Sequence, residues 1–150
     1  MDAKLFLRER MNIMSTSATI SEKNEFWIPK HRYYELKHFC LQYTYWRAHL
    51  YLSSSDTLKT ASVIYGVKSN GQLNEVEATA IRRDILQKRI DTIERAARES
   101  DPAIGEYILK GATQGKSYDE LNALYSLPCG REYYYKAYRR FFWILDSLRD

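Results

Sequence analysis

Residues 117–148, SYDELNALYSLPCGREYYYKAYRRFFWILDSL, decide the fold of this chain. The stretch opens as a capping box, in which the Ser117 hydroxyl accepts the backbone N–H of Glu120 and the Glu120 carboxylate reaches back. We expect a short helix over about 118–125, a tight connection, and a last helix over about 131–149. The apolar side chains of the short helix are Tyr118, Leu121 and Leu124.

The last helix has two distinct faces. Six side chains lie within about 80° of one another on a 3.6-residue wheel, and they form the expected core side: Tyr134, Ala137, Tyr138, Phe141, Leu145 and Leu148. The opposite side carries Glu132, Tyr135, Lys136, Arg139, Arg140 and Trp143, with Arg131 at its N-terminal edge. Residues 131–143 hold four basic side chains and one acidic side chain. Basic side chains neutralise phosphates, and the start of such a helix reaches base edges in the major groove.

A supporting helix is expected before this unit, over about 103–112, with its buried side formed by Ile104, Tyr107 and Ile108. Gly111 and Gly115 bracket its end, where residues with positive φ are common. A supporting helix, a short helix, a turn and a longer helix predict a helix-turn-helix over residues 101–150. A solvated basic face is the simpler alternative, because this segment holds seven basic and seven acidic side chains.

A long helix is expected over about 74–100, a stretch that contains neither Gly nor Pro. A short heptad-like seam, which we expect to pack within the domain, is formed by Leu86, Ile90, Ile93 and Ala97. Ile81 and Ile85 lie on another side, as candidates for contact with a second element or a second subunit. The long helix would therefore brace the helix-turn-helix, and it is a candidate dimerisation element.

The chain before the long helix is divided by its few glycines and prolines. Residues 1–26 are expected to form a flexible arm. Pro29 suits the first position of a helix over 29–52, because the missing N–H of proline costs nothing there. Within residues 57–72, Val63-Ile64-Tyr65 is a candidate strand and Asn70-Gly71 is a turn signal.

These elements predict an all-α fold in three parts. The parts are the arm (1–26), a helical N-terminal region that includes the long helix (27–100), and the helix-turn-helix (101–150). No internal repeat is present.

No metal site or cofactor is expected. His31 and His38 lie two turns apart, roughly 10 Å along one helix, and His49 lies three turns further, whereas ligands sit about 2 Å from a zinc ion. Cys129 precedes a helix N-terminus, a location that can lower a thiol pKa, so a redox role and a packed turn residue are its two interpretations. The sequence has no nucleophile elbow, phosphate-binding glycine loop or HExxH motif, so we do not expect an enzyme.

Composition sets limits on the class of protein. The 150 residues are 45% hydrophobic and 28% charged, which excludes wholesale disorder. No apolar run approaches the roughly 18 residues that a membrane span needs. The run at residues 5–7 is cut short by Arg8 and is no secretory signal. We therefore expect a cytoplasmic protein without a membrane partner, and its net charge of +4 hints at nucleic acid.

Residues 107–121, YILKGATQGKSYDEL, resemble the opening of a sigma-70 region 4 type helix-turn-helix. In that family a helix ends in a glycine turn and Ser-Tyr-x-x-Leu starts the next helix. The run from LPCGR (127–131) to YRRFF (138–142) stands where the family has its turn and recognition helix. The recognition helix here is more aromatic than is typical. The chain also lacks the other regions of a sigma factor, so promoter melting is not implied.

The chain from Trp27 onward also resembles small phage and prophage proteins of Gram-positive bacteria, akin to late-gene transcriptional regulators of the RinA and ArpU type. The similar parts are WIPKHRYYELK (27–37) and YRRFFW (138–143). The resemblance implies a DNA-binding regulator associated with the nucleoid of a bacterial host.

The expected function is therefore regulation of transcription by binding double-stranded DNA. The expected principal contacts are Arg131, Lys136, Arg139 and Arg140, and the flanking phosphate contacts are Tyr135 and Lys116. The alternative is a phage-encoded factor without catalytic activity that binds a host protein, such as RNA polymerase or a defence component. Its surface would be the aromatic-rich first helix or Trp143.

Overall fold

The computed structural model describes residues 22–53 and 70–149. Their regular elements are all helices: α2 (Lys30–Leu41), α3 (Tyr43–Ser53), α5 (Asn70–Ser100), α6 (Gly105–Gln114), α7 (Tyr118–Tyr125) and α8 (Arg131–Leu148). The all-α prediction is confirmed for this part of the chain. Residues 1–21 of the expected arm and the candidate strand at 63–65 lie outside it. Among the described helices, none is long and apolar enough to cross a membrane.

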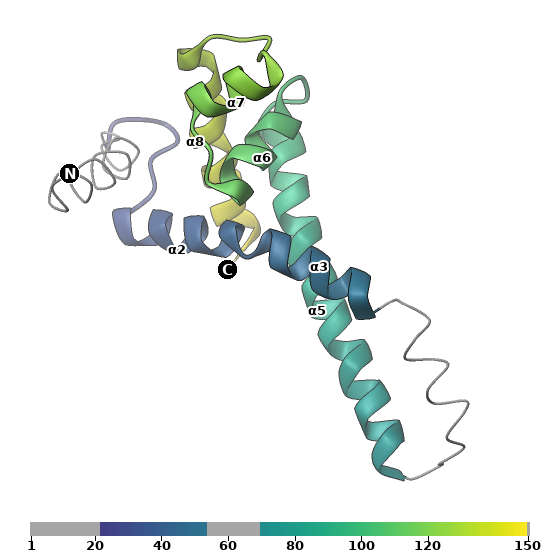
Figure 1. Ribbon diagram of the computed structural model, residues 1–150. Helices are drawn as coiled ribbons and strands as arrows, with labels where there is room; N and C mark the ends of the chain where they lie inside the picture. The colour runs from purple at the N-terminus through teal and green to yellow at the C-terminus, as the bar shows by residue number, and fades with distance from the viewer. Residues whose placement is uncertain (1–21, 54–69, 150) are drawn as a thin grey trace, which may run out of the picture.

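The long helix α5 is the axis on which the other helices are arranged (Figure 1). Its C-terminal half packs against α8, α6 and α3, and α2 packs on α6 and α8. The N-terminal half of α5 extends beyond the other helices (Figure 1). The molecule is therefore a helical body with one projecting helix.

The core lies where α2, α5, α6 and α8 meet. Ile90, Ile93 and Ala97 of the expected seam are buried and Leu86 packs at the edge of the core, so the prediction that this seam packs inside the domain is confirmed. The largest fully buried side chains include Tyr134, Phe141, Phe142, Leu36, Ile104 and Ile108. Aromatic side chains from α8 therefore fill the centre of the body.

The helix expected over residues 29–52 is two helices. Pro29 stands before the first helical residue, with extended backbone (φ −57°, ψ 143°), rather than at the first helical position. At Gln42 the backbone tightens, and its N–H donates to the Phe39 carbonyl at 3.3 Å. The interruption separates α2, which packs on α6 and α8, from α3, which packs on α5. The Gln42 backbone stays in the right-handed helical region (φ −84°, ψ −9°), so the interruption is slight and periodicity alone does not reveal it.

Two helix starts also differ from expectation. α5 begins at Asn70, so Asn70-Gly71 forms its first turn and not a hairpin turn. α6 begins at Gly105, because Asp101 organises a turn before it by accepting the N–H of Ala103 at 2.8 Å. Gly115 ends α6 with φ +65°, as expected. Gly111 is instead a buried residue inside α6, and its role is packing.

The last two helices match their expected ranges closely. Leu121 is buried as expected, whereas Leu124 is 58% exposed and does not belong to the core. Phe142 and Ile144 are buried although neither was assigned to the core side of α8. Phe142 is buried because α2 covers a second side of α8, where the Tyr33 and Phe142 rings meet edge to face at 5.0 Å. Ile144 lies about 200° from Phe142 on the helical wheel, at the other edge of the core side.

Candidate nucleic-acid interface

Side-chain hydrogen bonds shape the connection between α7 and α8. At the start of α7, the Ser117 hydroxyl accepts the Glu120 N–H at 3.3 Å, which confirms this half of the expected capping box. The Tyr118 hydroxyl donates to the Cys129 carbonyl at 2.7 Å, and the Leu127 N–H donates to the Asn122 side chain at 3.0 Å. These bonds fix residues 126–130 and thereby the angle at which α8 leaves α7.

Packing under this connection orients α8. Tyr134 is buried beneath α6, where a side chain at Gly111 would lie 2.2 Å from the Tyr134 hydroxyl. The Leu121 side chain reaches the same place from α7. Since these contacts hold one side of α8 inward, the side that carries Lys136 is turned outward.

The six predicted contact residues differ in their exposure. Arg131, Lys136 and Arg140 are exposed, and Lys116, Tyr135 and Arg139 are half-buried. Within the described part of the chain, Lys116, Lys136 and Arg139 form no ion pair. Their charges are therefore available to an external anion.

Arg131 and Arg140 each have an acidic neighbour. Arg131 pairs with Asp119 at 2.5 Å, and both side chains are exposed (61% and 68%). An exposed pair of this kind is worth only about 0–1 kcal/mol, so a phosphate can replace the carboxylate at small cost. The charge of Arg140 acts on Asp101 and helps to lower the pKa of that carboxyl.

Tyr135 and Lys116 have structural roles as well. The Tyr135 hydroxyl accepts the backbone N–H of Tyr118 at 3.3 Å and so supports the first turn of α7. It keeps its own proton for donation to a further acceptor. The Lys116 N–H donates to the Gly111 carbonyl at 3.1 Å and completes the end of α6.

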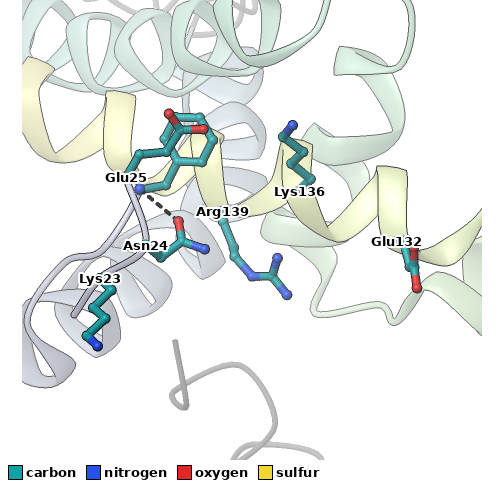
Figure 2. A pocket seen from close by; sticks show the side chains of 7 residues that line it. Lys23, Asn24, Glu25, Glu132, Lys136 and Arg139 are labelled. Atoms are coloured by element: carbon teal, nitrogen blue, oxygen red, sulfur yellow. Dashed lines mark hydrogen bonds between the residues drawn. The ribbon is translucent and has the colours of Figure 1, made fainter. Parts of the chain in front are cut away.

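The structure adds the segment 23–26 to this surface, which the sequence assigned to the flexible arm. An open pocket of about 600 Å³ is lined by Lys23, Asn24, Glu25, Phe26, Glu132, Lys136 and Arg139. In Figure 2 the Lys136 and Arg139 side chains leave α8 side by side and their charged ends diverge. The segment therefore borders two of the predicted contact residues.

A local turn and one ring contact hold this segment in place. The Asn24 side chain accepts the Phe26 N–H at 2.9 Å, and the Asn24 carbonyl accepts the Trp27 N–H at 3.1 Å. The Phe26 ring meets Trp143 of α8 edge to face at 5.8 Å. The sequence signal that could have indicated this is Asn24 with two aromatic residues at positions 26 and 27, because asparagine favours turns and large aromatic side chains are usually packed.

The pocket carries charges of both signs. Lys23, Lys136 and Arg139 are basic, and Glu25 and Glu132 are acidic. Two further acidic residues, Asp119 and Glu120, lie in the first turn of α7. The basic and acidic side chains around the pocket are therefore nearly balanced, so an anion would be attracted by individual cations and not by a strong overall positive field.

Of the two interpretations of Cys129, the structure favours the packed turn residue. Partial burial, together with the nearby Asp101 carboxylate, raises the pKa of the Cys129 thiol instead of lowering it. A protonated thiol is a poor nucleophile, so Cys129 is a packed turn residue. Among the described residues no group of three or more His, Cys, Asp or Glu side chains is placed to hold a metal ion.

Comparisons with protein-family models, curated proteins and solved structures found no match to this chain.

Proposed function

We propose that this protein is a transcriptional regulator of the phage and prophage type, which binds double-stranded DNA through a helix-turn-helix formed by α6, α7 and α8. In this proposal α8 enters the major groove as the recognition helix. The order and lengths of the three helices support it, as does the five-residue connection between α7 and α8. The proposal places the protein with the nucleoid in the cytoplasm of a bacterial host.

One observation carries the proposal: the outward side of α8 presents Lys136 and Arg139, which form no ion pair with any described residue, beside an open pocket. Unpaired cations on an exposed helix face are what phosphate binding requires, because each phosphate contact releases a counterion from DNA. Arg131 lies at the start of the same helix, the end that reaches base edges. Arg140, Tyr135 and Lys116 would add phosphate contacts at the edges.

The test removes the two unpaired cations together. For Lys136→Ala/Arg139→Ala we expect at least tenfold weaker binding to duplex DNA and a log–log salt slope that is shallower by roughly 2. The measurement is a fluorescence anisotropy titration at several salt concentrations, with circular dichroism to check that helicity is retained. The matched control is Arg83→Ala/Arg98→Ala, which removes from α5 one half-buried and one exposed cation that form no ion pair among the described residues, and it should leave the slope unchanged. Equal slopes for both double variants would reject α8 as the DNA-binding face.

A second candidate function is favoured by α3. Its exposed side carries large apolar residues, with Tyr45 69% and Leu52 66% exposed. Exposed aromatic residues are enriched at protein interfaces, so this surface suits a factor that captures a host protein such as RNA polymerase. Trp143 of α8, which is 43% exposed, is the alternative surface for such a partner. A salt slope near zero for the native protein, with tight capture of purified host RNA polymerase that Tyr45→Ala abolishes, would favour this function over the first.

A further inference from the structure

The projecting half of α5 has an outer face that no described helix covers. Ile81 is 61% exposed and Ile85 is 44% exposed, whereas Ile90 and Ile93 further along the same helix are buried. Two exposed isoleucines at a spacing of four form one apolar strip on a helix. Single exposed apolar residues are common on protein surfaces and need no explanation. Ile81 and Ile85 are informative because of their positions in the helical repeat of α5.

The exposed strip follows a heptad register. Successive spacings of four, three, four, three and four connect Asn74, Ala78, Ile81, Ile85, Lys88 and Thr92. The first five of these residues are exposed and the last is half-buried. The inward seam of Leu86, Ile90, Ile93 and Ala97 occupies a different side of the helix, about 130° away on a 3.6-residue wheel. α5 therefore carries one heptad stripe for its own core and another that faces outward.

The charges beside the outward stripe are complementary for one arrangement of two copies. In a parallel two-helix coiled coil, the residue just before the first core position of each heptad (position g) faces the residue five positions later (position e) on the other helix. Glu77 then faces Arg82 of the second copy, and Asp84 faces Arg89 of the second copy, and each pair is of opposite sign. All four of these side chains are exposed.

An antiparallel pair loses this complementarity on one flank. In that arrangement the flank that carries Glu77, Asp84 and Asp91 would face itself, and all three residues are acidic. Arg89 is held on the opposite flank by its contact with the Trp46 ring, 5.4 Å from the ring centroid. The charged end of the Lys88 side chain need not be buried in the interface, because its ammonium group pairs with Asp84 at 2.9 Å.

We propose that the outer face of α5 is a homodimer interface, on which a second copy of this chain docks in parallel with Ile81 and Ile85 at its centre. The interface is independent of α8 and does not require DNA binding. A parallel pair places both α6–α8 units at the same end of the dimer.

Sedimentation equilibrium of the full chain over a dilution series tests the interface without DNA. We expect the native protein to reach the mass of two chains, and Ile81→Asp/Ile85→Asp to stay at the mass of one chain with unchanged helicity. Glu77→Arg should raise the dissociation constant roughly tenfold, because two attractive pairs become repulsive. Glu77→Arg/Arg82→Glu should restore the native value. A monomeric native protein at every concentration would overturn the proposal, as would failure of the double exchange to restore association.

Disulfide trapping tests the direction of the pair. In a Cys129→Ser background, Ile81→Cys should form a disulfide between the two copies on mild oxidation, because parallel helices in register bring residue 81 of each copy together. The buried Cys40 thiol does not compete. An Ile81→Cys variant that crosslinks only when mixed with an Ile85→Cys variant would show an antiparallel pair and overturn the proposed arrangement.

Discussion

Gly111 lies where α6 passes directly over Tyr134 of α8. The Tyr134 hydroxyl is buried, and among the described residues it has no hydrogen-bond partner. Any side chain at Gly111 would lie 2.2 Å from this hydroxyl and 3.2 Å from the Leu121 side chain. The close approach of α6 and α8 thus depends on the absence of a Cβ atom at Gly111.

Gly111→Ala should lower the free energy of unfolding by about 1–3 kcal/mol, as overpacking of a core does. Gly130→Ala is the matched control, because nothing lies within 4 Å of its added methyl group and its φ is −80°. We expect that control to be neutral or slightly stabilising. Urea unfolding followed by circular dichroism measures both.

Tyr134→Phe removes the unpartnered hydroxyl and should therefore be neutral or stabilising. Because the two residues are in contact, their effects should couple, and Gly111→Ala should cost less in the Tyr134→Phe background. Additive effects in the double-mutant cycle would contradict the proposed contact.

Asp101 organises the entry to α6. Its carboxylate accepts the N–H of Ala103 at 2.8 Å and that of Ile104 at 3.3 Å, and it accepts the Tyr133 hydroxyl. Partial burial pushes the pKa of Asp101 up, but these three hydrogen bonds and the charge of Arg140 outweigh it, so the pKa is lowered. The charged form is thus favoured in the folded state.

Asp101→Ala should cost about 1 kcal/mol of stability near neutral pH, as the loss of a capping side chain does. Since the folded pKa is lowered, the charge contributes fully above the unfolded pKa of about 3.9 and is lost as pH falls through the folded pKa. The difference between native and variant unfolding midpoints should therefore shrink between pH 5 and roughly pH 2. A difference that is constant over this range would exclude a contribution from the charge.

At the scale of elements, α8 is packed on two sides and exposed on a third. α5 and α6 cover the side that carries Tyr134 and Phe141, and α2 covers the side that carries Phe142. Only the side with Lys136 faces outward, beside residues 23–26. A helix held on two sides presents its third side in a constant orientation, which suits a recognition surface.

Phe142→Ala should destabilise the protein by about 3–5 kcal/mol, because it empties a fully buried site between α8 and α2. Trp143→Ala, one residue further along, should cost about 1–2 kcal/mol, since Trp143 is 43% exposed and its recorded ring contact is with Phe26. Chemical denaturation compares the two variants. Equal losses would contradict the packing of α2 against this side of α8.

At the scale of the whole molecule, one cluster of charges joins the beginning of the described chain to its end. The Arg32 guanidinium donates to Asp146 at 2.6 Å, to Glu35 at 3.0 Å and to the Arg149 carbonyl. Arg149 in turn pairs with Glu35 at 3.2 Å and covers the Phe39 ring, 3.9 Å from its centroid. The cluster attaches α2 to the C-terminal end of α8.

Arg32→Ala should lower the free energy of unfolding by about 1–3 kcal/mol, because several hydrogen bonds to charged groups are lost at once. Arg32→Lys should recover only part of this, since an ammonium group cannot reproduce the planar guanidinium geometry. Thermal unfolding measures both. Arg95→Ala, which removes an exposed pair with Glu99, is the control and should cost less than about 0.5 kcal/mol. Full recovery of stability by Arg32→Lys would show that the planar geometry of the Arg32 guanidinium does not contribute.

The sequence by itself determined the local helices. Periodicity and capping located α7, α8 and the inward seam of α5, because helical hydrogen bonds and caps join residues at most four positions apart. For the same reason it identified the outward cations of α8. The interruption at Gln42 and the packing role of Gly111 were missed, since both depend on which neighbouring helix is in contact.

Only the tertiary structure decided which surfaces meet. It buried Phe142 by placing α2 against a second side of α8, it brought Phe26 to Trp143, and it paired Arg32 with Asp146. Each of these contacts joins residues more than 100 positions apart. Such contacts depend on how whole helices pack against one another around one core. The spacing of residues within a single helix does not determine that packing.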